Sequence, residues 1–161
     1  MLKKNLILFK QRFPDIEEKL SNTPINSFTL CETRKGEANL KYELNGKTIY
    51  IHSNYSAAKE TKKWISSLDL SNTQVLEIYG IGLGYSFFEL NSWLEDASHH
   101  LVFFENDLAI FEALLKMPYA EEIIKHPRVT IRFFGENPDQ DALSIEEFSL
   151  FYNFLEKKIT A

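Results

Sequence analysis

Residues 75–90 read VLEIYGIGLGYSFFEL, and this stretch decides the fold of the chain. The first five residues, 75–79, are mostly apolar and aromatic, which favours a strand buried on both faces. Gly80, Gly82 and Gly84 follow at once, and apolar residues then recur with helical spacing. A strand that leads through a glycine loop into a helix is typical of a Rossmann-like fold.

The alternation of strand and helix continues towards the C-terminus. Apolar runs at 101–105 and 129–134 predict two more strands, with helical patterns between them. We therefore expect a parallel sheet with helices on both faces. Because such sheets commonly have about five or six strands, the three predicted here indicate a minimal fold or a piece of a larger protein.

The N-terminal third has a different pattern. Apolar spacing of three and four predicts an amphipathic helix that breaks near Phe13, before Pro14. Alternating runs then predict an antiparallel meander, with one strand at 28–33 and a type I′ hairpin turn at Asn45-Gly46. That turn pairs Tyr42 with Ile49, which brings apolar side chains to one face.

The expected organisation is therefore an α/β chain in two parts packed as one compact domain. Residues 1–53 form the helix and meander, and residues 54–161 form the Rossmann-like unit. A helix over 55–68 opens the second part, with Ser53 or Asn54 as its cap and Trp64 on its apolar side. A capping box from Ser144 predicts the last helix.

The amino-acid composition limits the classes of function that the chain can have. The 161 residues are 44% hydrophobic and carry a formal net charge of −5, which disfavours a nucleic-acid-binding surface. The single cysteine, Cys31, has no partner for an internal disulfide. Since no run is long enough for a signal peptide core or a membrane span, we expect a cytoplasmic protein without a membrane partner.

The glycine loop and the acids after the next strand form the strongest functional signal. Gly80, Gly82 and Gly84 precede a helix, where backbone amides can approach a phosphate or ribose. Glu105 and Asp107 follow roughly twenty residues on, where an acid commonly accepts ribose hydroxyls. The pair predicts a nucleotide or nucleoside site, with Glu105 dispensable for folding. Alternatively, the glycines permit close packing and the acids cap the next helix.

The glycine loop departs from two known cofactor-binding motifs, and both departures limit the classes of ligand that it is expected to bind. Tyr85 occupies the position of the third glycine in a dinucleotide fingerprint. The loop is closer to the first motif of S-adenosylmethionine-dependent methyltransferases, but Glu77 precedes Gly80 by three residues where that motif has an acid two residues before. Because strand side chains alternate, Glu77 then points to the wrong face. We expect Glu77 to be exposed or paired.

Polar residues also gather where the meander meets the following helix. His52, Ser53 and Tyr55 either cap that helix or frame a polar pocket beside the glycine loop. His99 and His100 are adjacent in sequence and lack a second histidine at helical spacing, so no metal site is predicted. The candidate binding residues are thus Gly80, Gly82, Gly84, Tyr85, Glu105, Asp107, His52, Ser53 and Tyr55, and no catalytic residue or cofactor is assigned.

Several short motifs resemble the N-terminal domain of the motility-associated factor (Maf) glycosyltransferases. They cover roughly residues 40–135 and are IHSNY (51–55), KE (59–60), GIGLGY (80–85), FEND (104–107) and HPRV (126–129). The sequence departs from the family pattern at Ser56-Ala57, Thr61, Ser86 and Asn106. These departures affect the transfer of residue roles more than the fold.

The resemblance implies transfer of a sialic-acid-like (nonulosonic) sugar from a CMP-linked donor to flagellin. In that family the chemistry is attributed to a central domain that follows this one, so the chain would be an accessory module. Its partner would be flagellin or the rest of a larger chain. Two alternatives stay open: a small nucleotide- or S-adenosylmethionine-binding enzyme, and an interaction domain with an unused glycine loop.

Overall fold

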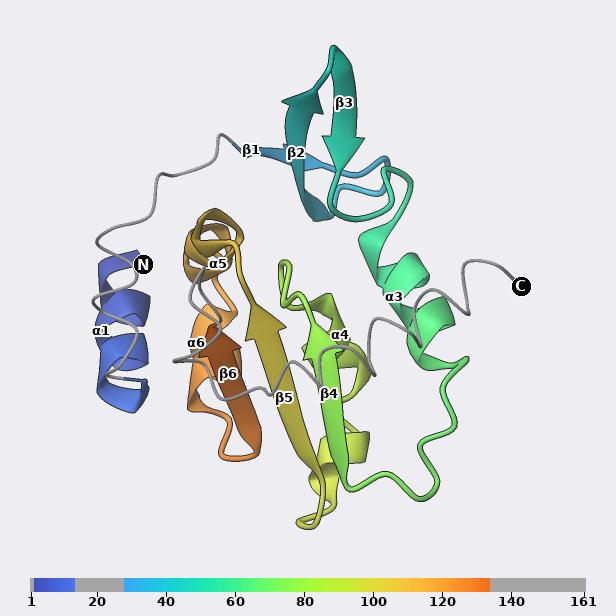
Figure 1. Ribbon diagram of the computed structural model, residues 1–161, viewed down its shortest axis with the longest axis vertical. Helices are drawn as coiled ribbons and strands as arrows, with labels where there is room; N and C mark the ends of the chain where they lie inside the picture. The colour runs from blue at the N-terminus through green and yellow to red at the C-terminus, as the bar shows by residue number, and fades with distance from the viewer. Residues whose placement is uncertain (1, 14–27, 134–161) are drawn as a thin grey trace.

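The computed structural model describes residues 2–13 and 28–133, and these form a mixed α/β structure with two separate sheets (Figure 1). This confirms the predicted fold class. In chain order the elements are α1 (Leu2–Arg12), β1 (Thr29–Glu32), β2 (Ala38–Leu44), β3 (Lys47–Tyr50), α3 (Ala57–Ile65), β4 (Val75–Tyr79), α4 (Tyr85–Glu89), the 3₁₀-helix η2 (Trp93–Glu95), β5 (His100–Glu105), α5 (Leu108–Leu115), α6 (Ala120–Lys125) and β6 (Val129–Phe133).

The second sheet is parallel, with the strand order β4-β5-β6. In its register Ile78 lies beside Phe103, and Phe103 lies beside Ile131. All three strands were predicted, and their direction is confirmed. Because the chain moves one strand at a time in the same direction, this order is the one found in half of a doubly wound sheet.

Burial differs sharply between the strands of this sheet. The central strand β5 is buried along nearly its whole length. In β4, by contrast, Val75 is 55% exposed and Tyr79 is 41% exposed, because β4 is an edge strand of the described sheet. The expectation of a fully buried strand at 75–79 is therefore wrong. Glu77 is exposed on β4, one of the two outcomes expected for it.

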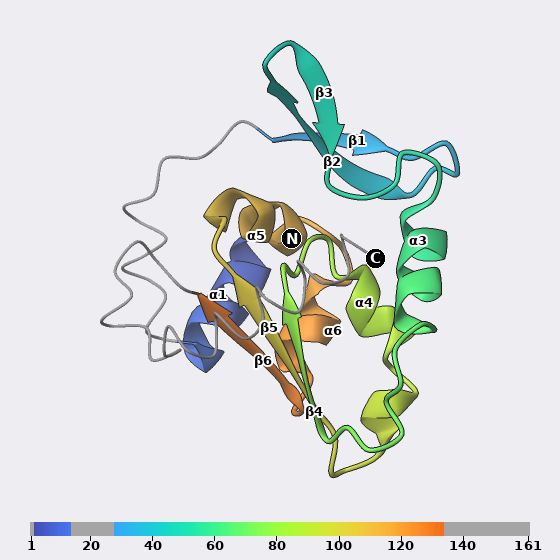
Figure 2. The same ribbon diagram turned by 45° about the vertical axis from the view of Figure 1, so that its right-hand side comes forward.

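The meander packs above the parallel sheet in Figure 2 and has the order β1-β2-β3. Tyr42 pairs with Ile49 as predicted. The turn residues Asn45 and Gly46 have φ values of 51° and 74°, as a type I′ turn requires. Leu40 is only 1% exposed and joins this sheet to the Rossmann-like part of the core.

Helix α1 lies against α6 although the two are far apart in sequence (Figure 1). Phe9 is fully buried, and its ring centroid lies 4.4 Å from that of Phe111. Asn5 Nδ2 donates to the Leu115 carbonyl at 2.8 Å. The helix ends at Arg12, which agrees with the predicted break. Pro14 itself lies outside the described residues.

Helix α3 begins later than predicted, and its cap is neither Ser53 nor Asn54. Ser56 is the N-cap, and its hydroxyl accepts the Lys59 amide at 3.1 Å. The cause is tertiary: the Glu37 carboxylate accepts the Ala57 amide at 2.6 Å and the Ser56 hydroxyl at 2.9 Å. The first turn of the helix is thereby fixed at this position.

The buried side of α3 also differs from the expectation. Its buried residues are spaced by four: Ala57, Thr61 and Ile65. Trp64 was expected on the apolar side but is 42% exposed. The helix predicted from Ser144 lies outside the described residues. In the parts of the chain that the structure describes, no helix is long and apolar enough to cross a membrane.

Candidate functional site

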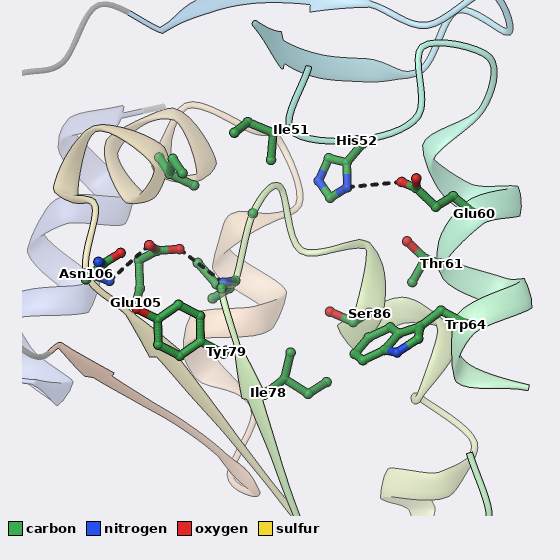
Figure 3. Close-up of a pocket in the computed structure, with 14 residues that line it drawn as sticks. Ile51, His52, Glu60, Thr61, Trp64, Ile78, Tyr79, Ser86, Glu105 and Asn106 are labelled. Carbon is green, nitrogen blue, oxygen red and sulfur yellow. Dashed lines mark hydrogen bonds and ion pairs between the residues drawn. The ribbon is translucent and has the colours of Figure 1, made fainter. Parts of the chain in front are cut away.

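A cleft of about 420 Å³ opens at the carboxyl ends of β4 and β5, below the end of the meander (Figure 3). This is the edge at which open α/β sheets commonly bind their ligands. The lining comes from four places: the end of the meander (Ile51, His52), α3 (Glu60, Thr61, Trp64), β4 with the glycine loop and α4 (Ile78, Tyr79, Gly80, Ile81, Gly82, Ser86), and the end of β5 with the segment that follows it (Glu105, Asn106, Ile110).

Glu105 lies in the cleft wall but is only 2% exposed. Its Oε2 accepts the Ile81 amide at 3.1 Å, and its Oε1 accepts the amides of Asn106 and Asp107 at 3.0 and 2.9 Å. The carboxylate therefore joins the glycine loop to the end of β5. Burial raises the pKa of Glu105, although the three amides act in the opposite direction.

These contacts change the role expected of the two acids. Glu105 accepts three backbone amides, which argues against the expectation that it is dispensable for folding. Asp107 is the N-cap of α5, where its carboxylate accepts the Ala109 amide at 2.9 Å. The capping alternative therefore describes Asp107. Glu105 lines the cleft with both oxygens already bonded to backbone amides, and Asp107 is not among the lining residues.

The glycine loop is bonded internally as well. Four of its five amides donate within the protein: Gly80 to the Phe104 carbonyl (2.6 Å), Ile81 to Glu105 (3.1 Å), Leu83 to His52 (3.4 Å) and Gly84 to the Ile81 carbonyl (3.0 Å). A Cβ on Gly84 would lie 2.4 Å from Ile123 Cδ1. The loop geometry thus favours the packing alternative over a phosphate cradle.

His52 is the link between the meander and the glycine loop. Its Nε2 accepts the Leu83 amide at 3.4 Å, and its Nδ1 lies 3.9 Å from Glu60 Oε2. A Cβ on Gly82 would lie 2.8 Å from the same Nε2. Burial lowers the pKa of His52, against the opposing effect of Glu60 and Glu37. The neutral imidazole is the form that can accept the Leu83 bond.

The three other candidate residues have structural contacts. The Ser53 hydroxyl accepts the Tyr55 amide at 3.2 Å. Tyr55 is 50% exposed and lies outside the cleft lining, with Lys35 Nζ 5.4 Å from its ring centroid. The Tyr85 hydroxyl donates to the Ala38 carbonyl at 2.8 Å, and burial raises the pKa of this phenol to about 12. Tyr85 therefore fastens the meander to α4.

Of the predicted candidates, the cleft lining includes His52, Gly80, Gly82 and Glu105. Sequence reasoning missed the other polar residues of the lining. Glu60, Thr61 and Trp64 come from one helix, and Ser86 comes from the first turn of α4 (Figure 3). The available signal was the spacing of Glu60 and Trp64, which are four residues apart and so share a helix face. Glu60 and Ser86 were noted only in connection with the family resemblance.

The adjacent residues His99 and His100 contact different partners. His99 Nδ1 lies 2.7 Å from the Trp93 carbonyl, and His100 Nε2 lies 2.8 Å from Thr130 Oγ1. Within residues 2–13 and 28–133, no three His, Cys, Asp or Glu side chains are grouped to hold a metal ion.

No protein-family model, curated protein or solved structure matches this chain significantly. The resemblance to the Maf glycosyltransferases therefore rests on the short motifs of the sequence, and the fold rests on the structure itself.

Proposed function

We propose that this chain is an accessory Rossmann-like module of a Maf-type flagellin glycosyltransferase and that sugar transfer takes place in another part of that enzyme. The order of the five motifs between residues 51 and 129 supports the family. The observation that carries the accessory role is the internal bonding of the glycine loop and Glu105.

Transfer from a CMP-linked donor places negative charge on the departing phosphate, and catalysis requires donors or cations aimed at that charge. In this module four amides of residues 80–84 already have acceptors in the protein. Glu105 is likewise committed to three amides. We therefore assign the module to assembly, with flagellin or the rest of the transferase as its protein partner.

A nucleotide- or S-adenosylmethionine-binding enzyme is the second candidate. The position of the cleft at the carboxyl ends of β4 and β5 favours it. The exposed Glu77 and the inward Glu105 weigh against it, because neither offers the acceptor that such cofactors require. A melting-temperature screen against S-adenosylmethionine, ATP, NAD and CMP tests this candidate. Saturation at a hundred times the dissociation constant adds about 2.7 kcal/mol of apparent stability.

The accessory role is tested with the purified chain, flagellin and a CMP-linked nonulosonate. We expect the flagellin mass to stay unchanged, because the glycine loop and Glu105 are already bonded within the protein and the described cleft lining holds no lysine or arginine for the departing phosphate. We also expect the chain to co-elute with flagellin or with a Maf central domain in size-exclusion chromatography. Sugar transfer by the chain alone would overturn the proposal, and so would failure to bind either partner.

A further inference from the structure

Two hydroxyl groups point into the cleft from the neighbouring helices α3 and α4, which together form one wall. Thr61 on α3 and Ser86 on α4 are each only 7% exposed. Figure 3 shows both oxygens turned towards the interior of the cleft. The described residues offer neither hydroxyl a hydrogen-bond partner. Neither oxygen is a buried unsatisfied atom, so both remain accessible from the cleft and can bond to a molecule bound there.

Glu60 and Trp64 extend the same wall. Glu60 Oε2 accepts the Ser53 amide at 2.8 Å, whereas Oε1 has no donor among the described residues. Trp64 lies one turn further along α3, and 42% of its surface is exposed. Trp64 and Ser86 both line the cleft (Figure 3). The wall thus combines one carboxylate edge, two hydroxyls and an aromatic face.

We propose that this cleft binds a small uncharged ring compound that carries adjacent hydroxyl groups. The ring stacks on the indole of Trp64, and its hydroxyls bond to Glu60, Thr61 and Ser86. A ligand hydroxyl both donates and accepts, so it matches a carboxylate that only accepts and protein hydroxyls that do either. A nucleoside and a neutral monosaccharide share this chemistry. The proposal is independent of the Maf assignment.

The charge of the lining disfavours a phosphorylated form of the ligand. Among the described residues that line the cleft, none is lysine or arginine, while Glu60 and Glu105 are both acidic. Four of the five loop amides that would otherwise receive a phosphate are bonded within the protein. The volume of about 420 Å³ falls within the range of about 300–1,000 Å³ for small-molecule sites.

Fluorescence titration tests the proposal, because the chain has two tryptophans, Trp64 and Trp93. Trp93 is stacked on His99 with centroids 4.3 Å apart and is not part of the cleft lining, so a Trp93→Phe chain keeps Trp64 as its one reporter. The probes are adenosine, cytidine, glucose and N-acetylglucosamine. Each is paired with a phosphorylated counterpart: AMP, CMP, glucose 1-phosphate and N-acetylglucosamine 1-phosphate.

We expect a saturable change in Trp64 fluorescence with a neutral probe, and at least about tenfold weaker binding of its phosphate. Binding confined to adenosine and cytidine identifies a nucleoside site, and binding confined to the two sugars identifies a sugar site. Absence of any change up to about 10 mM, ten times a weak dissociation constant, overturns the proposal. Equal or tighter binding of the phosphates also overturns it.

Substitutions that remove the hydroxyl of Thr61 or of Ser86 provide a second test of the proposal. Thr61→Val and Ser86→Ala should each weaken binding of the neutral probe about tenfold, because each removes one hydrogen bond to the ligand. Ser71→Ala changes an exposed hydroxyl outside the cleft and should bind like the parent chain. The melting temperature of each variant verifies folding. Unchanged affinity in both cleft variants would show that the hydroxyls do not contact a ligand.

Discussion

The two walls of the cleft differ in what their polar groups do. On the loop wall, four of the five amides of residues 80–84, the Glu105 carboxylate and the His52 imidazole are hydrogen-bonded within the protein. On the helix wall, Thr61 and Ser86 have hydroxyls without partners in the described structure. The residues that look most like a binding motif therefore hold the shape of the cleft. The residues whose hydroxyls are available to a ligand come from the amphipathic helix α3 and from the first turn of α4.

The largest expected effect on the loop wall is that of Gly84→Ala. Gly84 has a φ of +84°, and its new Cβ would meet the buried Ile123 at 2.4 Å. Strain and overpacking together should lower the free energy of unfolding by about 3–4 kcal/mol. Gly80→Ala is the matched control, because Gly80 has the same φ but no atom within 4 Å. It should cost only about 1–2 kcal/mol. Equal losses in urea unfolding would contradict the packing role of Gly84.

Glu105→Ala should have the next largest effect, about 2–3 kcal/mol, because three backbone amides lose their acceptor. Thermal unfolding should show this as a fall of about 4–12 °C for a chain of this length. Glu77→Ala is the control, since Glu77 is exposed on β4 and its loss should change stability by less than about 0.5 kcal/mol. Similar melting temperatures for the two variants would mean that Glu105 does not hold the loop.

A smaller effect is expected from the titration of His52. Burial lowers its folded-state pKa below 6.5, so the unfolded chain binds more protons in the window beneath that value. Stability from this group is therefore present above pH 6.5 and is lost as the pH falls towards the folded-state pKa. The melting temperature of the parent chain should therefore fall as the pH drops below 6.5. In His52→Gln this fall should be smaller by about 2–4 °C, which corresponds to roughly one hydrogen bond. An unchanged pH profile would show that His52 does not titrate in this window.

The smallest stability effect is expected on the helix wall. Thr61→Val removes a buried hydroxyl without a described partner and keeps the branched shape of the side chain. The free energy of unfolding should stay the same or rise by less than about 1 kcal/mol. Chemical denaturation of the variant beside Glu105→Ala compares the two walls directly. A clear destabilisation by Thr61→Val would place its hydroxyl in a structural bond and remove the contrast.

Most of the framework was predictable because it depends on local pattern. The strands at 75–79 and 101–105, the hairpin at Asn45-Gly46 and the end of the first helix near Phe13 all follow from periodicity and backbone preference. The parallel arrangement followed because helices separate the strands. Each of these inferences needs only residues that are neighbours in the sequence.

The errors involve partners that are distant in the sequence. Ser53, Asn54 and Ser56 are all suitable caps, and the choice among them is made by Glu37 in the meander. The inward orientation of Glu105 depends on the amide of Ile81, which lies 24 residues earlier. No local pattern distinguishes a carboxylate that accepts from a loop from one that accepts from a ligand.

The docking of α1 has a consequence for synthesis on the ribosome. Arg12 donates to the carbonyls of Ile124 and Val129, and the second contact spans 117 residues. At a translation rate of about 10 residues per second, α1 waits about ten seconds for its docking surface to emerge. During that interval Phe9 has no core to enter. Helix α1 is therefore made well before the surface that buries it, and Phe9 stays exposed on the nascent chain until that surface has formed.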